Sequence, residues 1–233
     1  MHKNLSFTAK QQMSDYLSSF ITSERMQKFN TIIENRTKYF SIVLENIFQS
    51  HNASAVLRSC DCFGVQDVHI IENSNHFEIN SDIALGASKW LSLYRYKQKK
   101  DASTFCLQQL KDKGYRIVAT VLHKDAYSID TLPIDSPFAL VFGTELNGLS
   151  EEAYKQADYF VKIPMYGFTE SFNISVSAAI SMFYFANKIR NQELSWKLTQ
   201  EEKIDVLLLW MKNSIKKSNL LEQKFLEEYN LKF

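Results

Sequence analysis

The hydrophobic positions follow a helical period at both ends of the chain and a strand-like pattern between them. In residues 1–38 apolar side chains recur every three or four positions, which predicts amphipathic helices. The side chains with this spacing are Met13, Tyr16, Leu17, Phe20, Met26, Phe29 and Ile33. The chain is expected to be helical again from Thr199, because Thr199 and Glu202 have the spacing of a capping box.

Short apolar runs between these ends have the length and composition of buried strands. They occupy residues 40–44, 68–71, 115–121, 137–142 and 160–163, and a further strand is expected at 90–96 because polar and apolar residues alternate there. Helices are expected at 103–113 and 151–157, from an N-cap at Asn52 to Gly64, and from a start between Ser171 and Asn173. Strands that alternate with helices predict an α/β fold with a mostly parallel sheet flanked by helices.

The pattern divides the chain into three parts. We expect an N-terminal helical extension at 1–38, an α/β domain at 39–190 and a C-terminal helical extension at 191–233. Within the domain, polar loops follow the strands that end near Val121, Phe142 and Ile163. Because ligands of parallel sheets bind beyond the carboxyl ends of the strands, these three loops predict a binding site.

Composition changes this picture little. The chain of 233 residues has 45% hydrophobic residues, which is enough for a filled core, and its net charge of +1 indicates no general attraction to nucleic acid. Cys60, Cys62 and Cys106 lack metal-ligand spacing and are expected to be small buried thiols, and His51 and His123 are not spaced as a metal pair, so no metal is predicted. No membrane span or signal peptide is recognisable, which favours a cytoplasmic protein.

Three segments carry a more specific signal. The first contains Asn52, Arg58 and Gly64, the second extends over 142–150 with Glu145, and the third extends over 163–176 with Asn173. Their order and spacing resemble the SpoU (TrmH-type) RNA ribose 2′-O-methyltransferases of the SPOUT superfamily, over roughly residues 40–190. The chain departs from the family pattern at Phe172, where leucine is usual, and at 49–51.

The resemblance implies a trefoil-knotted α/β fold, S-adenosylmethionine as cofactor, and a homodimer with its sites near the interface. It also implies methylation of a ribose 2′-hydroxyl in tRNA, with guanosine 18 of the D-loop as the expected target. Two alternatives remain open at this point: the same chemistry on ribosomal RNA, and a catalytically silent RNA-binding protein on the same fold. A nucleotide-binding dehydrogenase is disfavoured because no G-x-G-x-x-G turn follows an early strand.

The resemblance also assigns residues to roles. The catalytic candidates are Asn52, Arg58, Glu145 and Asn173. Glu145 is expected to pair with Arg58 or Asn52 and to order the site. A guanidinium is normally always protonated, so Arg58 acts either as an unusual base or by electrostatic stabilisation, and the sequence leaves both open.

The expected cofactor-lining residues are Thr120, Gly143, Ile163, Met165, Ser171 and Phe172. Replacing Gly143 with valine is expected to block the cofactor by filling the space beside the backbone. Basic residues of the helical ends and of 97–100 are candidates for phosphate contacts. These are Lys28, Arg36, Lys38, Lys97, Lys99, Lys100, Lys212, Lys216 and Lys217.

Overall fold

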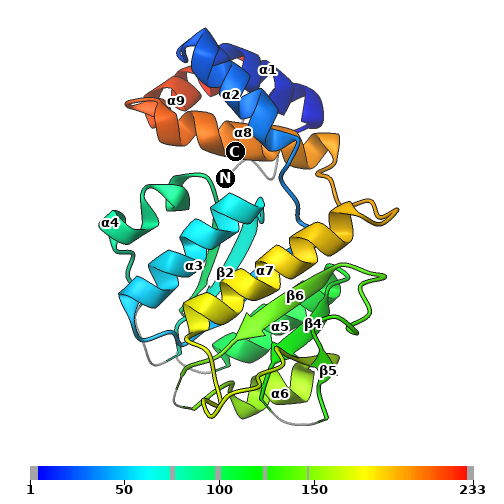
Figure 1. Ribbon diagram of the computed structural model, residues 1–233. Helices are drawn as coiled ribbons and strands as arrows, with labels where there is room; N and C mark the ends of the chain where they lie inside the picture. The colour runs from blue at the N-terminus through cyan, green and yellow to red at the C-terminus, as the bar shows by residue number, and fades with distance from the viewer. Residues whose placement is uncertain (1–4, 74–76, 98–100, 123–124, 146, 230–233) are drawn as a thin grey trace. The chain divides into compact units, whose positions relative to one another are not determined.

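A computed structural model describes residues 5–73, 77–97, 101–122, 125–145 and 147–229, and it divides the chain into two compact units. One unit is Thr37–Trp196, and the other joins Met1–Arg36 with Lys197–Phe233 (Figure 1). Across the described residues, every helix is too short or too polar to cross a bilayer.

The unit Thr37–Trp196 is built on one sheet of seven strands. In chain order these are β1 (Phe40–Glu45), β2 (Asp67–Ile71), β3 (Ser92–Tyr96), β4 (Arg116–Thr120), β5 (Tyr127–Ser128), β6 (Phe138–Phe142) and β7 (Tyr159–Lys162). The strand order is β3-β2-β1-β6-β4-β7-β5, and all the paired strands run parallel. The predicted parallel α/β sheet is confirmed; β5 was not predicted because two residues carry no periodicity.

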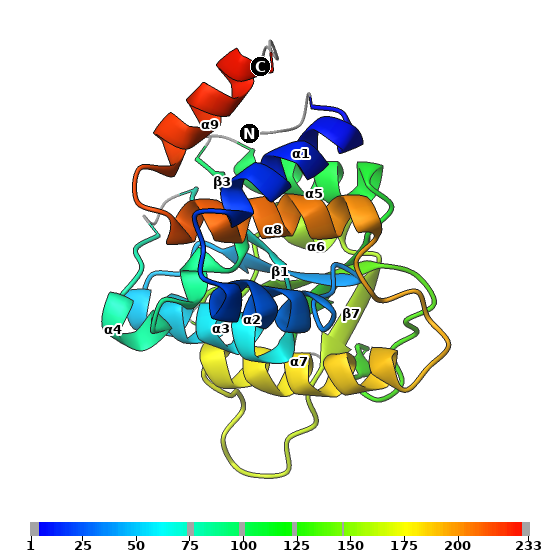
Figure 2. The same ribbon diagram turned by 90° about the horizontal axis from the view of Figure 1, so that it is seen from above.

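Helices cover both faces of this sheet. The pair α3 (Ser50–Phe63) and α7 (Ile174–Arg190) lies on one face, and α5 (Ala102–Asp112) with α6 (Glu151–Gln156) lies on the other (Figures 1 and 2). Strand β6 shows why both faces need cover. Phe138, Leu140 and Phe142 enter the core under α3 and α7, whereas Ala139 and Val141 enter the core under α5. A strand whose residues are all apolar, such as β6, is therefore buried on both faces of the sheet.

The ends of α3 differ from the prediction in one respect. The helix begins at Ser50 after Gln49, which makes no side-chain cap bond, so the expectation that Asn52 caps it was wrong. Asn52 lies inside the helix, and its amide is used elsewhere. The other end is as predicted: Gly64 adopts φ 78°, a left-handed conformation that favours glycine.

Cys62 is exposed on α3, whereas Cys60 and Cys106 are buried, so the prediction of three buried thiols was wrong for Cys62.

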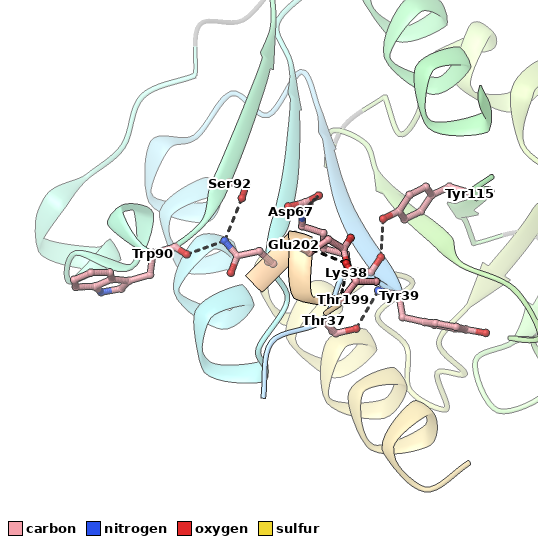
Figure 3. A network of polar contacts seen from close by, with 10 residues as sticks. Thr37, Lys38, Tyr39, Asp67, Trp90, Ser92, Tyr115, Thr199 and Glu202 are labelled. Atoms are coloured by element: carbon pink, nitrogen blue, oxygen red, sulfur yellow. Dashed lines mark hydrogen bonds and ion pairs between the residues drawn. The ribbon is translucent and has the colours of Figure 1, made fainter. Parts of the chain in front are cut away.

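The entry into β1 is held by a network of polar contacts (Figure 3). The Tyr115 hydroxyl donates to the carbonyl of Lys38 at 2.6 Å, and the amide of Tyr39 donates to the Thr37 hydroxyl at 3.0 Å. The Lys38 ammonium lies 3.9 Å from the Asp67 carboxylate at the start of β2. These contacts join the amino ends of β1, β2 and β4. The segment between β2 and β3 adds two short elements that were not predicted, α4 (Ser81–Ala84) and η1 (Ala87–Lys89).

The second unit contains four helices within the described residues. They are α1 (Phe7–Ser18), α2 (Ser23–Ile33), α8 (Gln200–Ser214) and α9 (Ser218–Glu228). Helix α8 packs against α1 and α2, and the buried side chains include Met13, Leu17 and Trp210. The predicted capping box at Thr199 and Glu202 is confirmed, with both reciprocal hydrogen bonds present.

Candidate active site

A cavity of about 430 Å³ opens at the carboxyl ends of β4, β6 and β7. The direction in which the chain adds strands to the sheet reverses between β1 and β6. Strands β2 and β3 lie on the β1 side of this point, and β4 and β7 lie on the β6 side. Ligands of parallel sheets bind at such a reversal. The cavity lies where the sequence predicted a site, and its volume is in the range of small-molecule sites. We call it the first cavity.

All six residues expected to surround the cofactor line the first cavity: Thr120, Gly143, Ile163, Met165, Ser171 and Phe172. Sequence pattern alone would place Ile163 and Phe172 in an ordinary core. In the structure Phe172 is 41% exposed and Ile163 is only partly buried, so both form a wall. The hydroxyl of Thr120 donates to the carbonyl of Val141 at 2.8 Å, which fixes that side of the cavity.

The loop after β6 forms the rim of the first cavity and folds back on itself. Thr144 and Gly148 exchange two backbone hydrogen bonds, of 2.9 and 3.0 Å. A Cβ on Gly143 would overlap the Gly148 carbonyl and would stand 2.6 Å from the Leu149 amide nitrogen. The expectation that a valine at Gly143 fills the ligand space therefore had the wrong reason: any side chain there first collides with the loop itself.

A buried carboxylate at the end of β1 anchors the same loop. Glu45 is 1% exposed, and its oxygens accept hydrogen bonds from the Ser150 amide at 2.9 Å and the Ser150 hydroxyl at 2.7 Å. The Ser103 hydroxyl of α5 also donates to it. Glu45 was not predicted as a site residue. The sequence feature that could have indicated it is an acidic residue directly after an apolar run. Its contacts fix where the loop that carries Glu145 returns to the fold.

Three predicted catalytic residues from distant parts of the chain meet in one polar cluster, which consists of Asn52, Glu145 and Asn173. The Asn52 amide donates to Oε1 of Glu145 at 2.9 Å, and the Asn173 amide donates to the same oxygen at 2.7 Å. The Asn173 amide also lies 3.2 Å from Oδ1 of Asn52. These residues are up to 121 positions apart in the chain. Oε2 of Glu145 accepts no hydrogen bond from the described residues, so it is open to a ligand.

The surroundings hold this cluster in place. Asn52 is 4% exposed, and its amide also donates to the Gln49 side chain at 2.8 Å. Asn173 is the N-cap of α7, because its oxygen accepts from the Ser175 amide at 2.9 Å. Two amides that donate to one carboxylate oxygen fix the orientation of that carboxylate.

Arg58 is not part of the cluster in this chain. It follows Asn52 by six residues, which places it about 9 Å further along α3 and about 240° around the helix. The side chain is exposed, and it makes no hydrogen bond or ion pair with the described residues. Of the two expected partners of Glu145, the structure therefore shows Asn52 and not Arg58.

A second cavity, of about 350 Å³, lies beside the polar cluster. It shares Thr144, Glu145 and Ile174 with the first cavity. Its other lining residues are Ile47, Phe48, Gln49, Asn52 and Asn147. Glu145 therefore borders two cavities. The first lies at the carboxyl ends of β4, β6 and β7, and the second lies toward the start of α3.

The basic candidates fall into two groups. Arg36 is 2% exposed and stacks 5.3 Å from the centre of the Trp210 ring, and Lys38 pairs with Asp67 as described above. Lys212 is bound at 2.6 Å to the buried carboxylate of Glu222. These three cations already have structural partners. Lys97 lies 3.8 Å from Glu72 with its side chain half exposed.

The remaining candidates are three exposed lysines, and two others lie outside the described residues. Lys28, Lys216 and Lys217 are exposed. Lys99 and Lys100 lie outside the described residues, as does His123. Among the side chains that the structure describes, His, Cys, Asp and Glu form no group of three or more able to hold a metal ion.

Comparison with known proteins identifies the family. A sequence model of the SpoU rRNA Methylase family matches residues 39–183. The chain belongs to this family. It is 42% identical over 206 residues to the tRNA (guanosine(18)-2′-O)-methyltransferase of Borreliella burgdorferi, covering 88% of this chain and 93% of that protein.

Other members of the SpoU family agree with this assignment. The tRNA (guanosine(18)-2′-O)-methyltransferase of Thermus thermophilus is 34% identical over 70% of this chain and 81% of its own length. Among solved structures, a TrmH/SpoU tRNA modifying enzyme of A. aeolicus superposes with a TM-score of 0.74 at 29% identity. The superposition covers 83% of this chain and 98% of the other. The three motif segments lie within the residues that the family model matches.

Proposed function

We propose that this protein is an S-adenosylmethionine-dependent methyltransferase that methylates the 2′-hydroxyl of guanosine 18 in tRNA. The observation that carries the proposal is the polar cluster of Asn52, Glu145 and Asn173 at the junction of two cavities. The names of its relatives in Borreliella burgdorferi and Thermus thermophilus support the same substrate. This substrate class supports the further proposal that the protein acts in the cytoplasm.

The first cavity fits the cofactor. Apolar walls from Ile163 and Phe172 suit an adenine ring, and hydroxyls of Thr120 and Ser171 suit the polar parts of the molecule. S-adenosylmethionine supplies a methyl group already activated by its sulfonium. The protein's own task is then to position a hydroxyl in line and to manage its proton.

Glu145 is the group we assign to the acceptor side. Asn52 and Asn173 hold one of its oxygens, so the carboxylate cannot rotate freely, and Oε2 is left to accept a hydrogen bond from the ribose hydroxyl. The two asparagines are positioning residues for this carboxylate. Removal of such an oriented contact typically costs about 10²–10³ in turnover.

Arg58 acts on the RNA as a cation. Its guanidinium is exposed on α3 and has five donors, which suits a bidentate contact with a backbone phosphate. Replacement by lysine keeps the charge but loses the planar fork, so Arg58→Lys should lose methyl transfer nearly as severely as Arg58→Ala. Cofactor affinity should stay unchanged in both variants, because Arg58 does not line the first cavity.

The exposed lysines of the helical unit are proposed to contact tRNA phosphates. Lys216→Ala combined with Lys217→Ala should weaken tRNA binding and reduce the slope of log K against log salt by roughly 0.7–0.9 per lost contact. Lys212→Ala is the matched control: it should lower the melting temperature by leaving the Glu222 carboxylate buried and unpaired. An unchanged salt slope in the double variant would remove these lysines from the RNA surface.

The protein is further proposed to be a homodimer with a trefoil-knotted domain. Ala178 of α7 is fully buried within the chain, so it does not face a partner. The exposed apolar residues on α7 are instead Val176 and Phe183, which are 43% and 61% exposed and suit a second copy. Light scattering that shows a monomer at micromolar concentration would exclude the homodimer.

Mixed dimers test whether the sites lie at the interface. Arg58→Ala and Glu145→Ala are each expected to be inactive. If one site uses Arg58 of one copy and Glu145 of the other, mixing the two variants restores part of the activity. If each site uses both residues of the same chain, the mixture stays inactive.

The central experiment is direct. The protein is incubated with methyl-labelled S-adenosylmethionine and total RNA, and the labelled ribose is mapped. Label at guanosine 18 of tRNA is the expected result. Label confined to ribosomal RNA, or no label while RNA still binds, would overturn the proposal in favour of the two alternatives.

A further inference from the structure

The loop between β1 and α3 carries an exposed aromatic ring. Phe48 is 77% exposed. It lines the second cavity together with Ile47 and Ile174. The ring is therefore an apolar surface beside the polar cluster.

The loop holds Phe48 in this position. On its N-terminal side the Asn46 amide donates to the Ile71 carbonyl at 2.9 Å, and Ile47 is buried in the core. On the other side the Gln49 carbonyl accepts from the Ala53 amide at 3.2 Å. Anchored neighbours on both sides present the ring to the cavity, which is a preorganised arrangement.

The connectivity of a nucleotide indicates what this cavity receives. The base is attached to C1′ of the ribose, and the hydroxyl to be methylated is attached to the adjacent carbon, C2′. When that hydroxyl lies at Glu145, the base must lie within one bond of the same ribose ring. The first cavity is assigned to the cofactor, and the second cavity is the adjoining space that borders Glu145.

We propose that the second cavity binds the nucleobase of the nucleotide being methylated, and that this base stacks on Phe48. The inference rests on the proposed function and deepens it. Unpaired bases of RNA loops are recognised in this way, since aromatic side chains stack on their exposed faces. A base held there is unstacked from its neighbours, which brings its ribose to Glu145.

The test combines a protein variant with an altered RNA. Phe48→Ala is compared with the unaltered protein on two RNAs, the normal substrate and one in which the target nucleotide keeps its ribose but lacks its base. On the normal RNA, Phe48→Ala should lower kcat/KM and RNA affinity by about 5- to 150-fold, the usual range for loss of one stacked base. On the abasic RNA the variant and the unaltered protein should be equal, because the contact is already missing.

Further variants separate stacking from simple apolar cover. Phe48→Tyr keeps the ring and should retain activity, whereas Phe48→Leu keeps apolar volume and should lose most of it. Leu85→Ala is a matched control, because Leu85 is also exposed, at 65%, and lines neither cavity. Cofactor affinity should be unchanged in all of these variants, and so should the molecular mass of the assembly in solution.

Each contrary outcome has a distinct meaning. Equal losses on both RNAs, or full activity of Phe48→Leu, would show that Phe48 does not stack on the target base. A lower molecular mass for Phe48→Ala would show that the ring belongs to a protein interface, which also overturns the inference. If the unaltered protein transfers no methyl group to intact tRNA, the proposed function itself fails, and the inference fails with it.

Discussion

Replacing Asn173 with aspartate separates the two contacts that this side chain makes. Its oxygen caps α7 by accepting from the Ser175 amide, and its amide donates to Glu145. Aspartate keeps the acceptor and is an equally good N-cap residue. The donor, however, is replaced by a second carboxylate that faces Glu145.

The geometry sets the size of the effect. A hydrogen bond to a charged group contributes about 1.5–3 kcal/mol. Two negative charges at the 2.7 Å separation of the present contact repel by about 1.5 kcal/mol even at the dielectric constant of water. A combined change of about 3–4.5 kcal/mol at the acceptor side corresponds to a rate lower by about 10²–10³-fold.

The pH dependence has a definite sign. Two adjacent carboxylates cannot both ionise easily, so the pair's apparent pKa is raised above the ordinary range of a carboxyl. Lowering the pH through that raised pKa protonates one partner and restores a donor. The ratio of variant to unaltered rate should therefore rise as the pH falls from about 8 to about 5.

The assay is single-turnover methyl transfer with saturating tRNA and cofactor, together with thermal unfolding. At about pH 5, where one carboxyl of the pair is protonated and the donor is restored, Asn173→Asp should melt like the unaltered protein, whereas Asn173→Ala should lose about 0.5–2 kcal/mol with its cap. Methyl transfer by Asn173→Asp at the unaltered rate near neutral pH would refute the role of the polar cluster. Equal destabilisation of the aspartate and alanine variants at about pH 5 would refute the separation of its two contacts.

Three other expectations follow from single contacts. Gly143→Ala should lower the melting temperature and cofactor affinity, because the new Cβ overlaps the Gly148 carbonyl; unchanged calorimetry would contradict that close approach. Glu45→Gln should lower the free energy of unfolding by about 1–3 kcal/mol, because an amide replaces an acceptor of the Ser150 bonds; an unchanged urea midpoint would contradict it. Burial lowers the pKa of His69 from 6.5 to about 3, so the unfolded chain takes up a proton that the folded chain refuses. The resulting stability is complete above pH 6.5 and is lost as the pH falls toward 3; His69→Gln should flatten this dependence, and an unchanged slope would exclude His69 as its source.

Much of the fold could be predicted because the strands of this sheet are continuous apolar runs. Residues 40–44 and 137–142 were placed within one residue of β1 and β6, since burial on both faces leaves few polar positions in the pattern. The two residues of β5 could not be found this way, because their pairing with β7 depends on the sheet and not on local composition.

The site was predictable as far as the motifs specify residue types, and no further. Which polar side chain pairs with which depends on contacts between distant segments. Glu145 was expected to pair with Arg58 or Asn52, and the sequence left both open; in the fold its partner is Asn52, 93 positions away. Glu45 was overlooked for the same reason, since its partner Ser150 is 105 positions away. No local pattern distinguishes these residues from solvent-exposed ones.

The helical unit is made from the two ends of the chain, and this has a consequence for the order of events during synthesis. Met13 and Leu17 of α1 are buried in a unit whose other half is α8 and α9. A ribosome that adds about 5–20 residues per second needs roughly 10–30 s to produce the intervening Thr37–Trp196 segment. During that time the apolar stripe of the emerging N-terminal helices has no partner, while the α/β unit can already complete its sheet. Nascent chains stalled before residue 197 should therefore bind chaperones that hold unfolded chains, and they should do so through their first 36 residues.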